Sequence, residues 1–156
     1  MLLTIDKVKI KFKKGRITAT GVIVLPSGVA FSDVLPFCIV GVNVAGTPVL
    51  PEATVPLLFE THGRHVDKWS FTDPGAALGI RRFRIDWRGG SHAKTRSGRF
   101  RLEAEFGGAA FPDGVATTPR TLDLILFVGA AGYMGDTTVA APELAIKGNH
   151  WHKTKR

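Results

Sequence analysis

The sequence has a single cysteine, no long apolar run and no convincing helical repeat. Cys38 is the only cysteine among 156 residues, which excludes a disulfide framework and a cysteine-based metal site. It lies in the apolar stretch PFCIV, so we expect a small buried side chain and not a nucleophile. No window approaches the roughly 18 uninterrupted apolar residues that a membrane helix needs, so we expect no membrane insertion.

The N-terminal residues also lack the pattern of a secretory signal. MLLTIDKVKIKFKK has no basic segment that is followed by a long apolar stretch and a small-residue cleavage site. On this ground alone we expect either a cytoplasmic protein or a chain that has already been processed.

Alternating apolar and polar residues, typical of half-buried strands, take the place of helical periodicity. The alternation is clear in KVKIKF, where Val8, Ile10 and Phe12 share one face, and it recurs in RFRIDWR at residues 82–88. The 18 glycines and 9 prolines separate such stretches at short intervals. The pattern predicts an all-β, antiparallel two-sheet sandwich of the jelly-roll or Ig-like kind, with residues 1–156 forming a single domain.

The most informative pattern is an internal duplication, whose pieces occur in the same order in both halves. The matches are VKIKFKKG (8–15) with FRIDWRGG (83–90), GRI (15–17) with GRF (98–100), GVAFSD (28–33) with GAAFPD (108–113), FCIVGVNVAG (37–46) with LILFVGAAG (124–132), and TPVLPE (47–52) with TTVAAPE (137–143). Four strands alone bury a poor core. The matches therefore predict two halves, about 1–60 and 76–147, that pack together with approximate two-fold symmetry. One more strand is expected around Val66–Thr72.

The same stretches carry a resemblance. The strand at Lys9–Gly15, the turn at Phe31–Asp33 and the buried run at Phe37–Gly41 are similar to parts of tandem β-sandwich modules in large bacterial surface and secreted proteins. This resemblance implies a non-catalytic structural role and an extracellular or cell-surface location.

Two aspartates occupy equivalent points of the repeated AF(S/P)D motif. Asp33 and Asp113 could act as paired acid/base groups or as calcium ligands. Alternatively, each could hold a turn by accepting a hydrogen bond from the backbone two residues on. A duplication repeats scaffold more readily than it creates an asymmetric active site, so we favour the turn.

The histidines and serines carry no recognisable catalytic pattern. In HWH on a strand, two imidazoles would share one face, but a metal site needs three or four ligands and we favour solvated side chains. The histidines are His62, His65, His92, His150 and His152. No G-x-S-x-G is present, and the glycine-rich stretches do not lead into a helix. We therefore expect no enzyme activity, no cofactor and no metal.

The net charge of +8 allows attraction to an anionic partner. The charge is uneven, since residues 25–60 contain no Lys or Arg. The candidate anion-binding residues are Lys7, Lys9, Lys11, Lys13, Lys94, Arg96, Lys153 and Arg156. The aromatic residues of the basic strands lie on their apolar faces, so they are expected in the core and not as stacking platforms for bases. A solvated strand face remains the alternative to a binding surface.

Two functions follow as expectations. The first is a structural or assembly protein, a homo-oligomer or polymer such as a subunit of an extracellular fibre or surface layer, formed by strand exchange. The strands expected to exchange carry Leu2, Leu3, Ile5, Val139, Leu144 and Ile146. The alternative is a module that binds a carbohydrate or another anionic polymer such as a polysaccharide. Nucleic-acid binding ranks third.

Overall fold

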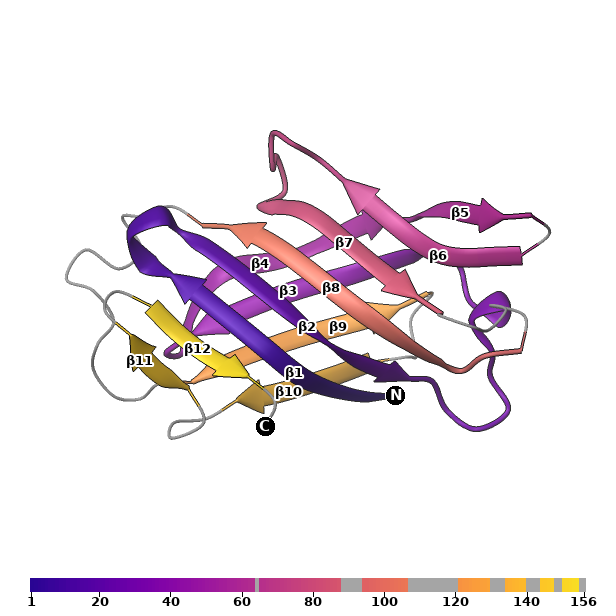
Figure 1. The fold of residues 1–156 in the computed structure, drawn as a ribbon, viewed down its shortest axis with the longest axis horizontal. Coiled ribbons are helices and arrows are strands. Elements are labelled where there is room, and N and C mark those ends of the chain that lie inside the picture. Colours follow the sequence, from indigo (N-terminus) through magenta and orange to yellow (C-terminus); the bar gives the residue numbers. More distant parts are fainter. Residues whose placement is uncertain are drawn as a thin grey trace.

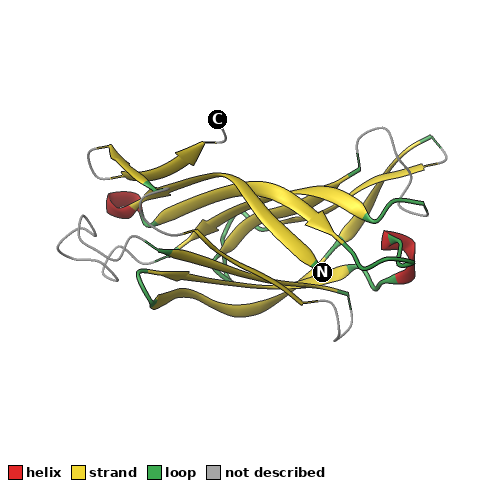
Figure 2. Ribbon diagram, turned by 90° about the horizontal axis from the view of Figure 1, so that it is seen from below, coloured by secondary structure: helices red, strands yellow, loops and turns green. Residues whose placement is uncertain are grey.

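The computed structural model describes residues 1–63, 65–87, 94–106, 121–129, 134–139, 144–147 and 150–154. These residues form two antiparallel sheets, with short 3-10 turns at Phe12–Lys14 and Phe31–Asp33 and no α-helix among them. Figure 2 shows the sheets edge-on as two packed layers. The predicted all-β, two-sheet sandwich is confirmed. In the described part of the chain, no helix has the length and apolarity to cross a membrane.

The larger sheet has eight strands and the smaller has four (Figure 1). In spatial order, the larger sheet contains β11 (Ala145–Lys147), β12 (His150–Thr154), β1 (Leu2–Lys11), β2 (Arg16–Val24), β8 (Ser97–Glu105), β7 (Ile80–Asp86), β6 (His65–Thr72) and β5 (Leu58–His62). The smaller sheet contains β10 (Met134–Val139), β9 (Leu122–Val128), β3 (Phe37–Val44) and β4 (Thr47–Pro56). The strand expected around Val66–Thr72 is β6.

The alternation of the sequence builds the core between the sheets. Val8 and Ile10 of β1 and Phe83 and Ile85 of β7 point inward and are almost fully buried. One continuous cluster of buried apolar side chains runs through both sheets. The aromatic residues of the basic strands are therefore core residues, as expected.

The strand order of both sheets is symmetric. Exchanging β1–β6 with β7–β12 gives each order read backwards. The central pairs are β2 with β8 and β3 with β9. Each half lends a strand to the other, because β6 pairs with β7 and β12 pairs with β1. The sequence duplication itself stays a prediction, since four of its five matches include residues outside the described ranges, at 88–90, 108–113, 130–132 and 140–143.

The strand register agrees with the first two sequence matches. In the first hairpin, Ile10 lies opposite Ile17. In the second hairpin, their counterparts Ile85 and Phe100 lie opposite each other. The predicted matches of β1 with β7 and of β2 with β8 therefore correspond to equivalent pairs in the sheet.

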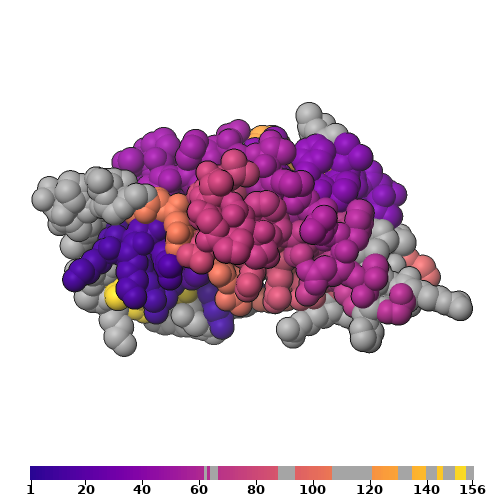
Figure 3. All heavy atoms as spheres, turned by 90° about the horizontal axis from the view of Figure 1, so that it is seen from above, coloured from indigo at the N-terminus to yellow at the C-terminus, as the bar shows by residue number. Residues whose placement is uncertain are grey.

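Strands β6 and β12, each of which pairs with a strand of the other half, carry matching tryptophans. Trp151 of β12 makes an edge-to-face contact with Phe12, with ring centroids 5.0 Å apart. Trp69 of β6 makes the same kind of contact with Trp87, at 5.3 Å. Figure 3 shows pink atoms around β6 and β7 in the middle of one long side, flanked by indigo atoms of the N-terminal hairpin and purple atoms of the first half. Segments distant in the sequence thus share one surface.

Candidate anion-binding face

Charged side chains divide unequally between the two outer faces of the sandwich. The outer face of strands β1, β2, β8, β7, β6 and β5, which we call the basic face, carries ten cationic side chains and five carboxylates. The cations are Lys7, Lys9, Lys11, Arg16, Lys68, Arg81, Arg82, Arg84, Arg99 and Arg101, and the carboxylates are Asp6, Glu60, Asp86, Glu103 and Glu105. The four strands of the smaller sheet contain no Lys or Arg. The basic face therefore has a surplus of five positive charges.

A row of lysines follows β1 along this face. Lys7, Lys9 and Lys11 alternate with inward-pointing apolar residues, so all three point outward. Lys9 and Lys11 lie opposite His152 and His150 of β12. None of the three lysines forms an ion pair with a carboxylate of the described residues. Their ammonium groups can therefore meet an external anion.

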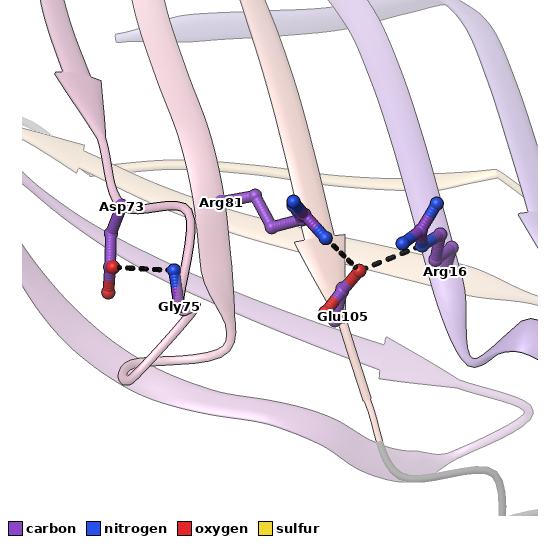
Figure 4. Close-up of polar contacts among 5 residues, drawn as sticks. All are labelled: Arg16, Asp73, Gly75, Arg81 and Glu105. Carbon is purple, nitrogen blue, oxygen red and sulfur yellow. Dashed lines mark hydrogen bonds and ion pairs between the residues drawn. The ribbon is translucent and has the colours of Figure 1, made fainter.

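A carboxylate joins arginines from the two neighbouring strands at one end of the face. Glu105 of β8 accepts hydrogen bonds from Arg81 and Arg16, each 2.7 Å from the same Oε1 atom (Figure 4). The hydrogen bond from Arg81, followed by that from Arg16, lowers the pKa of the Glu105 carboxyl group, and both arginines add Coulomb attraction. Two guanidinium groups on one carboxylate leave this cluster with a net positive charge.

Other arginines of the basic face also pair with carboxylates. Glu103 lies 2.7 Å from Arg101 and 3.9 Å from Arg82. Arg99 donates a 2.8 Å hydrogen bond to Asp6, the residue at the β-bulge of β1. Exposed ion pairs of this kind add little stability. Their main effect here is to hold several guanidinium groups in place on one surface.

A groove of about 310 Å³ lies between the lysine row and the Glu105 cluster. Its charged lining consists of Lys9, Lys11, Arg16, Arg81 and Glu103. Thr18 adds a hydroxyl group to its lining. The groove therefore combines four cations with one carboxylate and is suited to an anionic group.

The other predicted anion-binding residues lie elsewhere. Lys13 is not on the strand face, because β1 ends at Lys11 and the chain turns through Phe12–Lys14 into Gly15, which has a left-handed φ of 57°. Lys94 and Arg96 are exposed at the opposite end of the sheet, next to β2's last residues. Lys153 lies opposite Val8, on the inward side of β12. Arg156 lies outside the described residues.

The sequence prediction missed the arginines of β2 and β8. Arg16, Arg99 and Arg101 alternate with buried residues in GRI and GRFRLEAE, so the alternation could have assigned them to the same face. Arg81 could not be found in this way. It lies at the irregularity between Ile80 and Arg82, which shifts the register of β7 against β8.

Of the other groups considered in the sequence, Asp33 holds a turn and Cys38 lies in the core. Asp33 accepts a 2.8 Å hydrogen bond from the backbone N–H of Ala30, so it holds a turn as predicted, but through the residue three before it and not two after. Cys38 is fully buried, and burial raises the pKa of its thiol. Asp113 and His92 lie outside the described residues, and the side chains of His62 and His65 are not described. Within the described ranges, no group of three or more His, Cys, Asp or Glu residues is arranged to hold a metal ion.

Most residues predicted to exchange between copies lie in this chain's own core. Leu3, Ile5, Val139 and Leu144 are at most 7% exposed. Leu2 points outward and is 61% exposed, and the side chain of Ile146 is not described. The strand β1 pairs with β2 along its whole length and with β12 from Lys7 to Lys11. Strand exchange would therefore have to withdraw paired and buried residues.

Comparisons of the chain with protein-family models, with curated proteins and with solved structures found no match.

Proposed function

We propose that the protein is a non-catalytic binding module that holds an anionic polymer on its basic face. The observation that carries this proposal is the one-sided charge, with ten cations on the outer face of the larger sheet and none on the strands of the smaller. Outward side chains on a strand repeat about every 7 Å. Rows of cations on several strands therefore suit an extended chain of anionic groups better than one small ion.

An anionic polysaccharide fits this face better than single-stranded nucleic acid. Bases bind most strongly where exposed aromatic rings provide stacking platforms. The aromatic residues of β1 and β7 and of the turns that follow them, Phe12, Phe83 and Trp87, are at most 5% exposed. Sulfate or carboxylate groups need only the cations, which the face presents without aromatic partners.

Retention on heparin tests this proposal. We expect the protein to bind immobilised heparin at low salt and to lose affinity steeply as the salt concentration rises. Lys9→Gln combined with Lys11→Gln should weaken binding about tenfold and reduce the slope of log affinity against log salt by roughly 1.5. A fluorescence titration with a labelled heparin fragment measures both quantities.

A matched control removes the same charge away from the basic face. Lys94→Gln combined with Arg96→Gln changes two exposed cations at the end of the sheet and should leave the affinity within about twofold, because charges beyond a Debye length of ~10 Å are screened. Equal losses in both variants would mean a nonspecific charge effect and would refute the proposed site. Tighter binding of a single-stranded oligonucleotide than of heparin would contradict the choice of polysaccharide.

A structural role in an extracellular fibre or surface layer is a second proposal. The resemblance to surface-protein modules supports this role and a cell-surface location. Strand exchange receives little support from the geometry, since Leu3 and Ile5 would lose their core contacts before a partner could replace them. The outer faces of the two sheets offer a route to assembly that keeps every strand in place.

A further inference from the structure

The outer face of the smaller sheet combines an apolar centre with carboxylates. Ile39, Ile125 and Phe127 point outward and are half-buried. Phe127 lies opposite Ile39, so the two form an apolar row across the central strand pair. We call this surface the acidic face, because the charged residues of its four strands are all carboxylates.

The carboxylates lie beside and beyond the apolar row. Asp136 of the edge strand β10 is exposed and lies opposite Ile125. Glu52 comes from the other edge strand, and a Cβ on Gly41 would lie 3.0 Å from its Cγ, so its side chain crosses the sheet surface there. Asp123 lies two residues further along β9. The acidic face thus changes from apolar to negative along the strands.

The basic face has the complementary gradient. At one end, Leu2, Val22 and Val24 point outward, and Leu2 is 61% exposed. The next positions of β1 on this face are Thr4 and the bulge residue Asp6, which binds Arg99, and the lysine row begins at Lys7. Each face therefore places apolar side chains beside charged ones, and the net charges of the two faces are opposite in sign. On both faces the outward residues of a strand repeat every ~7 Å.

We propose that the acidic face of one copy docks on the basic face of a second copy. Ile39 and Phe127 then cover Leu2 and its neighbours, while the carboxylates meet the lysine row. Charge complementarity selects this pairing, because contact between two basic faces or two acidic faces would bring like charges together. The inference goes beyond the binding of a polymer and shares only the basic face with it.

The geometry of the contact determines the kind of assembly. The two surfaces differ, so the contact is heterologous and each added copy presents a free face to the next one. A face of four strands, about seven residues long, measures only about 19 by 23 Å. Such an area is below that of a standard stable interface. We therefore expect weak, salt-sensitive and open-ended association.

Charge-swapped variants test the pairing directly. The basic-face variant carries Lys7→Glu and Lys9→Glu, and the acidic-face variant carries Asp123→Lys and Asp136→Lys. Sedimentation velocity should find concentration-dependent oligomers for the unmodified protein at low salt, which dissociate as salt is added. Each variant alone should be monomeric. An equimolar mixture should form a dimer and nothing larger, because only one compatible pair of faces remains.

The variant that carries all four substitutions should stay monomeric, because its basic face keeps a surplus of one positive charge and its acidic face, with two lysines and Glu52, also carries one. As a control, Lys13→Glu with Lys14→Glu changes the same charge on the exposed turn and should leave association unchanged. Circular dichroism establishes that each variant is folded. If Asp123→Lys unfolds the protein, Glu52→Lys with Asp136→Lys, both at exposed positions, provides the same test.

Two results would overturn this inference: a monomer at every concentration in low salt, or a mixture of the two variants that forms no complex. Heparin binding separates this inference from the proposed function. The acidic-face variant retains its basic face, so it should bind heparin at least as tightly as the unmodified protein while it no longer self-associates. If the unmodified protein self-associates but does not bind heparin, only the proposed function is contradicted.

Discussion

Gly21 leaves no room for a side chain in the larger sheet. It lies in β2 opposite Ile5, beside the β-bulge of β1. A Cβ at this position would lie 1.8 Å from the carbonyl oxygen of Thr4 and 2.6 Å from the ring of Phe100. The first contact is with backbone and cannot be relieved by a change of rotamer. The absence of a side chain is what allows β1 to approach β2 this closely.

We therefore predict that Gly21→Ala lowers the free energy of unfolding by about 3 kcal/mol or more, because β1 must move away from β2. Urea denaturation followed by tryptophan fluorescence measures the loss. The neighbouring Thr20→Ala, on the outward side of the same strand, should cost less than about 1 kcal/mol. A Gly21→Ala variant as stable as Thr20→Ala would contradict the close approach.

Sequence patterns could not identify Gly21 at the scale of the residue. GRITATGVIV predicts an alternating strand, and the glycine fits its inward positions only as a small residue. A side chain is excluded at Gly21 because the bulge in β1 places the carbonyl group of Thr4 over this residue. The bulge is a property of the strand pair and not of either sequence segment alone.

At the scale of the element, Glu105 connects β8 to β2 and β7 through its two arginines. Because its pKa is lowered in the folded protein, the carboxylate stabilises the fold at pH values above its ordinary pKa, near 4.5. That contribution is lost as the pH falls through the lower folded pKa. Part of the acid sensitivity of the protein should therefore originate at this position.

We predict that Glu105→Gln lowers the melting temperature at pH 7 but flattens its decline between pH 5 and pH 3. Thermal unfolding followed by circular dichroism at several pH values measures both effects. Glu52→Gln, on the edge strand of the smaller sheet, serves as the control and should keep the decline of the unmodified protein. A parallel decline in the Glu105→Gln variant would show that other groups account for the acid sensitivity.

The strands with regular alternation could be predicted, whereas β4 could not. β1, β2, β7 and β8 follow the two-residue period that the sequence displays. β4 contains Pro48, Pro51 and Pro56, which argue against a strand in the middle of a sheet. The structure accommodates it because β4 is an edge strand, where a missing N–H donor leaves no neighbour unpaired. Edge position depends on the complete sheet order, which no local pattern contains.

At the scale of the whole molecule, the sequence indicated two related halves but not how they interlock. The matches of Ile10 with Ile85 and of Ile17 with Phe100 were visible in alternating strands. The correspondence of Trp69 with Trp151 was not, because the residues around them differ. It emerges only once β6 pairs with β7 and β12 with β1. The basic face has the same origin, since its arginines and lysines come from both halves.

This interlocking predicts how the protein behaves when its halves are separated. Residues 1–75 and 76–156 meet in the turn between β6 and β7. There Asp73 accepts hydrogen bonds from the N–H groups of Gly75 and Ala77 at 3.0 and 2.8 Å, and Figure 4 shows the one from Gly75. A break after Gly75 interrupts the bond to Ala77 but no strand. Each half alone lacks a neighbour for a strand that carries a buried tryptophan. We therefore expect neither half to fold by itself.

An equimolar mixture of the halves should recover the fold, because β2 can pair with β8, β6 with β7 and β12 with β1 across the two fragments. Near-ultraviolet circular dichroism and gel filtration should then match those of the intact chain. Trp151→Ala in the second fragment removes a ring that is 1% exposed and packs on Phe12. Since truncation of a buried tryptophan costs about 3–5 kcal/mol, this variant should weaken the complex more than a hundredfold. A native-like spectrum from either half alone would contradict this prediction. It would show that the half folds without the pairing of β6 with β7 and of β12 with β1.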